Sequence, residues 1–550
     1  MHRRGRGATR GRHHPQSHRG SGDRPDLQGK GEEDRQLRRL RGDPPGPRRL
    51  DPHIRAREPP GRARRGRRQG RRSRSREGDR SRRGREDPPL AQGGPPRRGR
   101  EGIVPRGTSG TAVHRRSRVR FIRKLDRIRP NETVRKAILP GGLTILVEEV
   151  PQVHSLTLGV WIRTGSRDEP ADLSGISHFI EHMVFKGTRS RSALQIAKKM
   201  EAVGGQLDAF TSREQTCYYA RVFDEHLDIA METMGDLLLN PLFSRDLVDR
   251  EQGVIAEEIE SYDNNPEEQV HDLISAEIWP NHPLGRPILG SRQTISRFGS
   301  RTLRRYHQER YTAPNVVVAA SGHVSFDRVM ELASRHLAFP PGAAPNGRFP
   351  LTRFRSRAVR HEKDVSQVSL CLAGRGPSYH DEDRHALAVV NMILGAGVSS
   401  RLFQKIREDE GLAYTVYSFM DVLRDTGLFG IYLGVAPEKA RTVLALACRE
   451  IAKLKRGGIR RWELESAKAQ LLMSHLLSYE STYERMNRIA INEICYGRQS
   501  SLESVIERVQ AIDRDEVEAA LDRYLRPRRF GLITLGPAGK DYPGEGDWDF

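Results

Sequence analysis

The hydrophobic segments of this chain follow an order that occurs twice, and this repeat constrains the fold more than any other feature. Their periodicity predicts a strand, two helices, two strands and two helices before residue 340, and the same series follows residue 356. Between the two series, residues 340–350 contain four prolines and two glycines, which is typical of a linker. The sequence therefore predicts an α+β protein with two similar consecutive domains, residues 131–339 and 356–550, joined by a linker over residues 340–355.

The first 130 residues differ in composition from the rest of the chain. They hold 41 Lys and Arg against 14 Asp and Glu, an excess of +27. The remainder holds 94 − 41 = 53 basic and 71 − 14 = 57 acidic residues, so the whole-chain charge of +23 arises in residues 1–130. Because apolar residues are sparse and not periodic there, the segment cannot bury enough surface to offset the entropy lost on ordering. We predict a disordered Arg-rich extension.

The basic extension is compatible with two functions or with none. A basic arm could bind nucleic acid. A mitochondrial transit peptide fits poorly, because acidic residues are scattered through the segment and no amphipathic helix is visible. We favour an extension without function of its own, and we do not expect a nucleic-acid partner.

Cysteine content and hydropathy argue against several classes of protein. The four cysteines, Cys217, Cys371, Cys448 and Cys495, form no C-x-x-C pair, so neither a disulfide framework nor a thiolate zinc site is expected. No apolar run reaches the roughly 18 residues that span a bilayer, and no secretory signal is visible. We expect no membrane partner and a cytoplasmic location in a bacterium, with the mitochondrial matrix as the alternative.

The helix predicted over residues 175–186, with Ser174 as its candidate cap, contains the motif His178-Phe179-Ile180-Glu181-His182. Residues four apart share one helical face, so both imidazoles can reach the same metal ion, and Glu181 leans over that face. Catalytic zinc takes three protein ligands, and a nearby carboxylate can accept a proton from water. The spacing is the inverted form of the zinc-peptidase helix. Two histidines in a hydrophobic core would be the alternative.

The helix predicted over residues 244–264 supplies the missing carboxylates. Glu251 and Glu258 are seven residues apart and share a face, whereas Glu257 points elsewhere and should be solvated. One of the pair can complete the metal site, and the other can orient a ligand histidine or the water.

With these motifs in register, the sequence resembles the pitrilysin/insulinase family of zinc peptidases, in the branch of mitochondrial and bacterial processing peptidases. The match to the zinc helix continues through Lys186-Gly187-Thr188, and residues 165–169 and 281–285 are also similar to the family. The resemblance covers residues 134–540. It implies that Glu258, 258 − 182 = 76 residues after His182, is the third ligand of one Zn²⁺ per chain, that Glu251 is the second buried glutamate, and that Glu181 is the base.

The resemblance assigns a different role to the second domain. Leu387, Val390 and Asn391 stand where the first domain has His178, Glu181 and His182, so no metal is expected there. Arg407 and Tyr414, seven residues apart, are implied to reach the substrate and the tetrahedral intermediate, where both can donate hydrogen bonds to an oxyanion. The alternative is an Arg in a helical ion pair and a Tyr in the core.

The strand Gln206–Thr211 resembles the family's edge strand that pairs with an extended peptide. The family often has Asn where this chain has Asp208, and the negative charge could favour basic substrates. Alternatively, Asp208 only caps a turn.

These features together predict a zinc metalloendopeptidase that hydrolyses unstructured peptides or presequences with metal-activated water. The resemblance implies that the two domains form half of a clamshell. We therefore expect a homodimer, or a heterodimer with a paralogue, in which Arg407 and Tyr414 serve the partner's site. The alternatives are a non-catalytic assembly subunit of the same family, and nucleic-acid binding through the basic arm.

Overall fold

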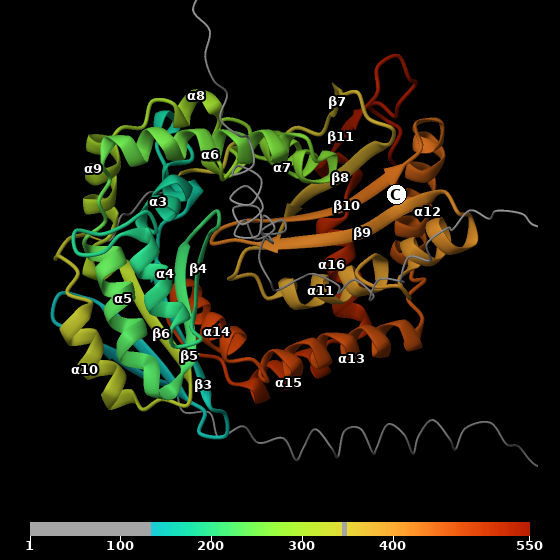
Figure 1. Cartoon of the computed structure of the whole chain (residues 1–550). Helices are drawn as coiled ribbons and strands as arrows, with labels where there is room; N and C mark the ends of the chain where they lie inside the picture. Colours follow the sequence, from blue (N-terminus) through green and yellow to red (C-terminus); the bar gives the residue numbers. More distant parts are fainter. Residues whose placement is uncertain (1–133, 344–348) are drawn as a thin grey trace, which may run out of the picture. The chain divides into compact units, whose positions relative to one another are not determined.

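Two mixed β-sheets, one in each half of the chain, form the framework of the structure (Figure 1). The computed structural model describes residues 134–343 and 349–550, and both stretches belong to one compact unit. Each sheet carries helices, so the predicted pair of consecutive α+β domains is confirmed. The extension over residues 1–130 and part of the predicted linker lie outside the described residues.

The first sheet has the strand order β1-β2-β6-β3-β5-β4. Its strands are β1 (Val134–Ile138), β2 (Thr144–Glu149), β3 (Ser155–Ile162), β4 (Gln206–Thr211), β5 (Thr216–Phe223) and β6 (Val316–Gly322). All neighbours are antiparallel except β2 and β6. The predicted edge strand, β4, lies at the edge of the sheet, where one side of its backbone is free to pair with another chain.

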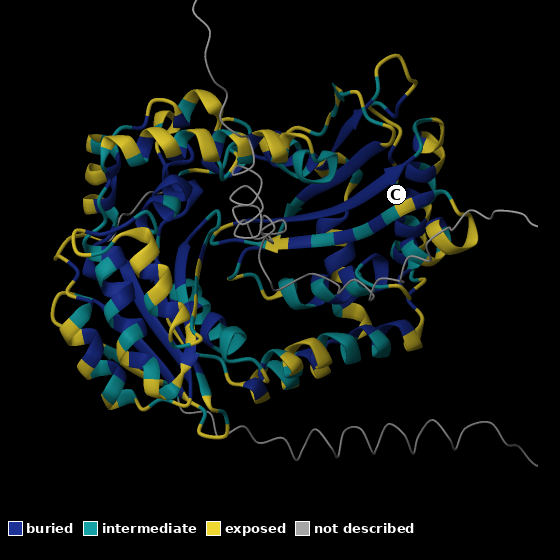
Figure 2. Ribbon diagram, in the orientation of Figure 1, coloured by how far each residue is buried: buried dark blue, intermediate teal, exposed yellow. Residues whose placement is uncertain are grey.

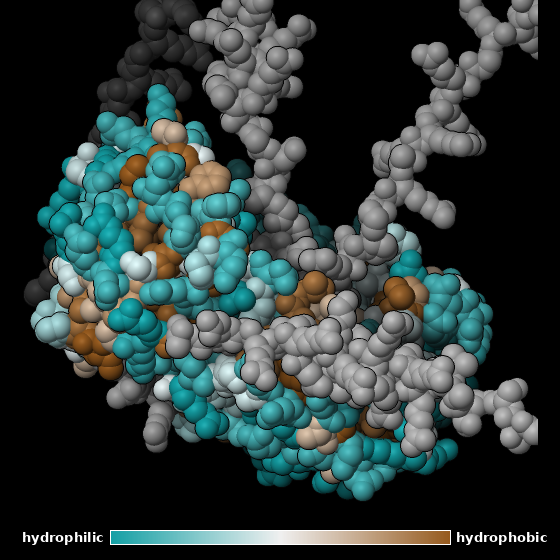
Figure 3. Space-filling model, turned by 90° about the horizontal axis from the view of Figure 1, so that it is seen from below, coloured by the Kyte–Doolittle hydropathy of each residue, from teal (hydrophilic) through white to brown (hydrophobic). Residues whose placement is uncertain are grey.

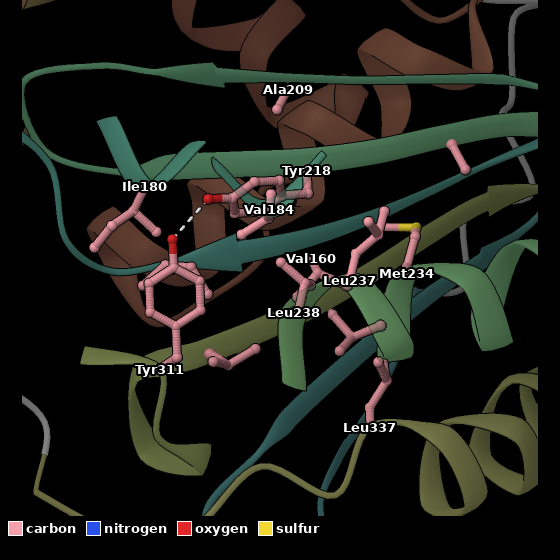
Figure 4. Close-up of a cluster of buried hydrophobic side chains, with 14 of the residues drawn as sticks. Val160, Ile180, Val184, Ala209, Tyr218, Met234, Leu237, Leu238, Tyr311 and Leu337 are labelled. Atoms are coloured by element: carbon pink, nitrogen blue, oxygen red, sulfur yellow. Dashed lines mark hydrogen bonds between the residues drawn. The ribbon is translucent and has the colours of Figure 1, made fainter. Parts of the chain in front are cut away.

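One face of the first sheet is covered by helices of the same domain. They are α3 (Ile176–Val184), α4 (Ala193–Glu201), α5 (Leu227–Leu239), α6 (Arg245–Asp263), α9 (Ser300–Arg310) and α10 (Phe326–His336). Figure 4 shows part of this core, where Ile180 and Val184 of α3 lie beside Tyr218, whose hydroxyl is 2.6 Å from that of Tyr311. Figure 2 shows the strands buried and the outer faces of several helices exposed.

The second sheet has the order β7-β11-β8-β10-β9. Its strands are β7 (Ala358–Glu362), β8 (Val368–Gly376), β9 (Ala413–Val422), β10 (Gly427–Val435) and β11 (Phe530–Gly536). The core on one face is formed with α11 (Asp383–Leu394), α12 (Ala440–Lys455), α13 (Arg461–Ser478) and α16 (Arg514–Tyr524).

Each domain covers the second face of the other domain's sheet with one helix. Strand residues alternate between the faces of a sheet, so Val316 and Val318 join the core of the first domain, whereas Val317 and Ala319 pack against α14 (Thr482–Tyr496). In the same way α7 (Pro266–Ile278) packs on β8 and β11. Neither helix was predicted from the sequence. Their exchange ties the two domains together.

The helices of the described residues can be compared in length and hydropathy with those that cross a bilayer. None of the helices in residues 134–343 and 349–550 is both long enough and apolar enough to cross a bilayer. Figure 3 shows hydrophilic side chains over most of the visible surface, with hydrophobic ones in small groups between them.

Candidate active site

The helix that carries the histidine motif, α3, is buried on nearly all sides. Eight of its nine residues are buried, which holds the helix axis and its side chains in place. Ser174 does not cap it. The N-cap is Gly175, whose φ of 93° is in the left-handed region that favours glycine, and the carboxylate of Glu169 accepts hydrogen bonds from the amides of Gly175 and Ser177 at 2.8 Å each. Burial raises the pKa of Glu169 to about 7, although those two amides lower it.

The three predicted ligands lie together. His178 and His182, one turn apart on α3, have ring centroids 4.6 Å apart. The Oε2 atom of Glu258, on α6, is 3.8 Å from His178 Nε2 and 3.4 Å from His182 Nε2. One ligand atom from each residue lies within 4.8 Å of the other two, so a single metal ion can touch all three. Glu257 is exposed, as predicted.

Glu251 supports this group from behind. It is 3% exposed and lies 2.7 Å from Nδ1 of His182 and 2.8 Å from Nζ of Lys186. Burial by itself would raise the pKa of Glu251, but the hydrogen bonds and positive charges of His182 and Lys186 outweigh it and lower that pKa. An ionised Glu251 accepts a hydrogen bond from Nδ1 of His182, which leaves Nε2 of that ring as the atom that can bind a metal.

Glu181 occupies the same face of α3 as the two histidines and is 2% exposed. The hydroxyl of Thr211, the last residue of β4, donates to Oε2 of Glu181 at 2.6 Å. The edge strand therefore ends at the carboxylate that was predicted to be the base.

The donor set fits a zinc ion. Nε2 of His182 is buried and makes no hydrogen bond within the described part of the chain, while its Nδ1 is held by Glu251. Two imidazoles and one carboxylate are a ligand set of catalytic zinc, which keeps a fourth position open. Glu258, with 32% of its side chain exposed, forms the open side of the group.

The second domain has no counterpart of this site. Leu387, Val390 and Asn391 are buried on α11, and both apolar side chains belong to the domain core. Arg407 lies on a π-helical segment, Phe403–Asp409, and its guanidinium stacks on Phe403 and on Tyr414, at 4.8 and 5.5 Å. Tyr414 is 74% exposed, so it is not a core tyrosine. Within the described residues, Arg407 stacks on Phe403 and Tyr414, and the candidate metal group is formed without this pair.

Asp208 lies on β4, on the other face from Thr211. Its carboxylate accepts from the amide of Ala209 at 2.8 Å and from the hydroxyl of Tyr219 at 3.2 Å. The pairing of β4 with β5 makes Ser212 N donate to Gln215 O, so the alternation of an antiparallel ladder turns the Ala209 amide toward the free edge. The carboxylate of Asp208 thus accepts a hydrogen bond from the Ala209 amide, the group that would otherwise donate to a strand added at this edge.

Sequence reasoning missed three residues that shape the site. Lys186 is four residues after His182, a helical spacing that could have shown it. Glu169 lies only six residues before Gly175, but it does not stand at the cap position itself. Thr211 carries no sequence signal, because β4 meets α3 only through the tertiary fold.

Comparison with known proteins supports this architecture. Residues 144–292 match the insulinase family (peptidase family M16), and residues 298–471 match the peptidase M16 inactive domain. A Mycobacterium tuberculosis protein named an uncharacterized zinc protease is 38% identical over 413 residues, which are 74% of this chain and 93% of that protein. The uncharacterized zinc protease YmxG of Bacillus subtilis is 37% identical over 406 residues, 74% and 99% of the two chains.

Solved structures share the fold. A crystal structure described as a peptidase M16 inactive domain from Pseudomonas fluorescens has a TM-score of 0.70 and 23% identity, covering 75% of this chain and all of that one. A protease from Helicobacter pylori has a TM-score of 0.67 and 22% identity, covering 74% and all of the respective chains. From the family matches, the extent of the bacterial relatives and the two-domain fold, this chain belongs to the insulinase family of peptidases, peptidase family M16.

Proposed function

We propose that this protein is a zinc-dependent endopeptidase that hydrolyses extended peptides. The observation that carries the proposal is the meeting of His178, His182 and Glu258, from two helices, with ligand atoms within 4.8 Å of one another. Glu181 lies one turn along the same helical face. The names of the bacterial relatives, zinc proteases, are consistent with this chemistry.

The roles follow from the positions of the side chains. His178, His182 and Glu258 would hold the zinc ion, which supplies a Lewis acid that polarises the scissile carbonyl. Glu181 takes a proton from the attacking water and delivers it to the nitrogen of the leaving amine. The water oxygen forms a bond to the carbonyl carbon, the C–N bond breaks, and Glu181 returns to its ionised state.

The substrate is an extended peptide paired with β4. The strand offers a free edge and ends at Thr211, which contacts Glu181, so a peptide added to this edge runs past the base. Main-chain pairing tolerates many sequences, which suits unstructured peptides or presequences. Asp208 is the side chain on β4 that would prefer a basic residue. The relatives described above are bacterial, which favours the bacterial processing peptidase over the mitochondrial one.

The working unit is a dimer, of identical chains or with a paralogue. Arg407 and Tyr414 are exposed and stack on each other, so they are free to donate hydrogen bonds in a partner's site. Mixing Glu181→Gln with Arg407→Ala chains tests this. Each variant is inactive alone, and recovered activity in the mixture shows that Arg407 acts across subunits. Absence of recovery, together with a monomeric mass in solution, contradicts the dimer.

The test of the reaction is the Glu181→Gln variant. It should bind one zinc per chain, by metal analysis, yet lose about 10²- to 10⁴-fold in kcat on a peptide library. Glu257→Gln, an exposed position on α6, is the matched control and should cleave normally. Normal cleavage by Glu181→Gln refutes the mechanism. A wild-type chain that binds no zinc favours the alternative, a non-catalytic assembly subunit.

A further inference from the structure

The turn between β9 and β10, in the domain without metal ligands, reaches the loops that flank the candidate site. Its Arg424 donates from both terminal guanidinium nitrogens to the two carboxylate oxygens of Asp168, at 3.3 and 3.1 Å. The amide of Arg424 also donates to both carboxylate oxygens of Glu214, at 3.1 Å. The next residue, Asp425, accepts from Arg167 at 2.5 Å.

These groups form one ionic network, which we call the hairpin junction: Arg167, Asp168, Glu214, Arg424 and Asp425. Its first-domain members are only 3–5% exposed, and Arg167 also donates to Glu214 at 2.6 Å. The side chains of Arg424 and Asp425 are 37% and 46% exposed, so water reaches the second-domain side of the junction. The carboxylate of Asp168 is buried, so it stays largely desolvated without compensation if it loses Arg424. The buried charges of the first domain are therefore stabilised by these ion pairs.

The hairpin junction is connected to the site through two routes. In the first, Asp168 precedes Glu169, whose carboxylate accepts from the first amides of α3. In the second, Glu214 belongs to the turn that follows Thr211, and Thr211 donates to Glu181. Displacing the junction would thus disturb both the start of the zinc helix and the hydrogen bond to the base.

The two loops of the first domain are also joined directly. The amide of Arg167 donates to Arg213 O at 2.8 Å, and that of Ser166 donates to Ser212 O at 3.2 Å. At Gly165 the loops are so close that a Cβ atom would lie 2.4 Å from Ser212 O, which explains the glycine. Backbone hydrogen bonds therefore join the two loops, and Arg424 and Asp425 contact both of them from the second domain.

We infer that Arg424 is a positioning residue: the β9–β10 hairpin of the metal-free domain sets the placement of α3 and of β4, and through them of Glu181. The catalytic part of this inference rests on the proposed function. Arg424 touches none of the candidate ligands, so it acts on catalysis only through the loops. This gives the second domain a role in the chemistry that its lack of ligands conceals.

Two readouts on the full chain test the inference. In hydrogen exchange, Arg424→Ala should raise exchange in α3 and β4 but not in α12, which lies in the second-domain core. In kinetics it should lower kcat by about 10- to 100-fold, a larger change than that in KM, with one zinc per chain retained. Arg424→Lys keeps the positive charge but loses the bidentate hydrogen bond to Asp168. It should fold, and its exchange and kcat should lie between those of the wild type and of Arg424→Ala. Arg441→Ala, which removes the exposed pairs to Asp541 and Asp547, is the matched control.

Each outcome has a distinct meaning. Unchanged exchange in α3 and β4 overturns the inference, and so does raised exchange with unchanged kcat. If Arg424→Ala raises exchange throughout α12 as well, the comparison of Arg424→Lys with Arg441→Ala decides, and equal behaviour of those two overturns the inference. If the wild-type chain cleaves no peptide while exchange in α3 and β4 still rises, the proposed function fails but the structural coupling stands.

Discussion

Replacing Glu251 with Gln tests whether the site is built for a metal ion. The carboxylate of Glu251 lies 2.7 Å from His182 Nδ1 and 2.8 Å from Lys186 Nζ, and the residue is 3% exposed. Gln keeps an oxygen that accepts a hydrogen bond from His182, but its amide is neutral. The imidazole therefore loses the neighbouring negative charge that makes Nε2 a stronger metal ligand. It also places an amide near Lys186, whose ammonium group loses its counter-ion.

The expected loss of zinc affinity is about 10- to 100-fold, which corresponds to about 1.4–2.7 kcal/mol of binding free energy. Competition with a chromogenic chelator at fixed pH measures it. Glu257→Gln, on the same helix but exposed, should bind zinc as the wild type does. Zinc affinity of Glu251→Gln within twofold of the wild type would refute the view that Glu251 orients His182 for a metal.

Three further predictions concern stability and binding. Burial lowers the pKa of His307 from 6.5 to about 4, so as the pH falls the unfolded state takes up a proton on this ring before the folded state does. The contribution of a neutral His307 to the free energy of unfolding is complete above pH 6.5, and about 3 kcal/mol of it is lost as the pH falls to 4. Urea unfolding of His307→Gln should show a weaker pH dependence over that window, and an identical one would contradict the assignment. Residues 131–339 alone lack α14, so the isolated segment should not unfold cooperatively in urea, and a sharp transition would contradict the exchange of helices. Asp208→Ala frees the Ala209 amide and should lower the KM for a neutral peptide without changing kcat, whereas a raised KM would show that Asp208 serves binding directly.

The local elements with strong periodicity followed from the sequence. The edge strand β4 and the helices α3 and α6 lie within a few residues of the predicted bounds. The helices α7 and α14 were missed, because each buries its apolar face on a sheet of the other domain and nothing in its own sequence names that partner. The expected Ser174 cap was wrong, because the carboxylate of Glu169, in the loop before the helix, accepts the hydrogen bonds from the amides of Gly175 and Ser177.

Residue spacing already shows which side chains can share a face: two imidazoles and a carboxylate within five residues of one helix, and two carboxylates seven apart on another. Helical periodicity is a local property, so spacing is enough for that. Spacing does not show that α6 lies against α3 with Glu258 beside both histidines, that Thr211 contacts Glu181, or that Arg424 contacts the loops around them; these contacts come from the packing of the fold. These contacts join residues between 30 and 256 positions apart, and they depend on how whole helices and sheets pack.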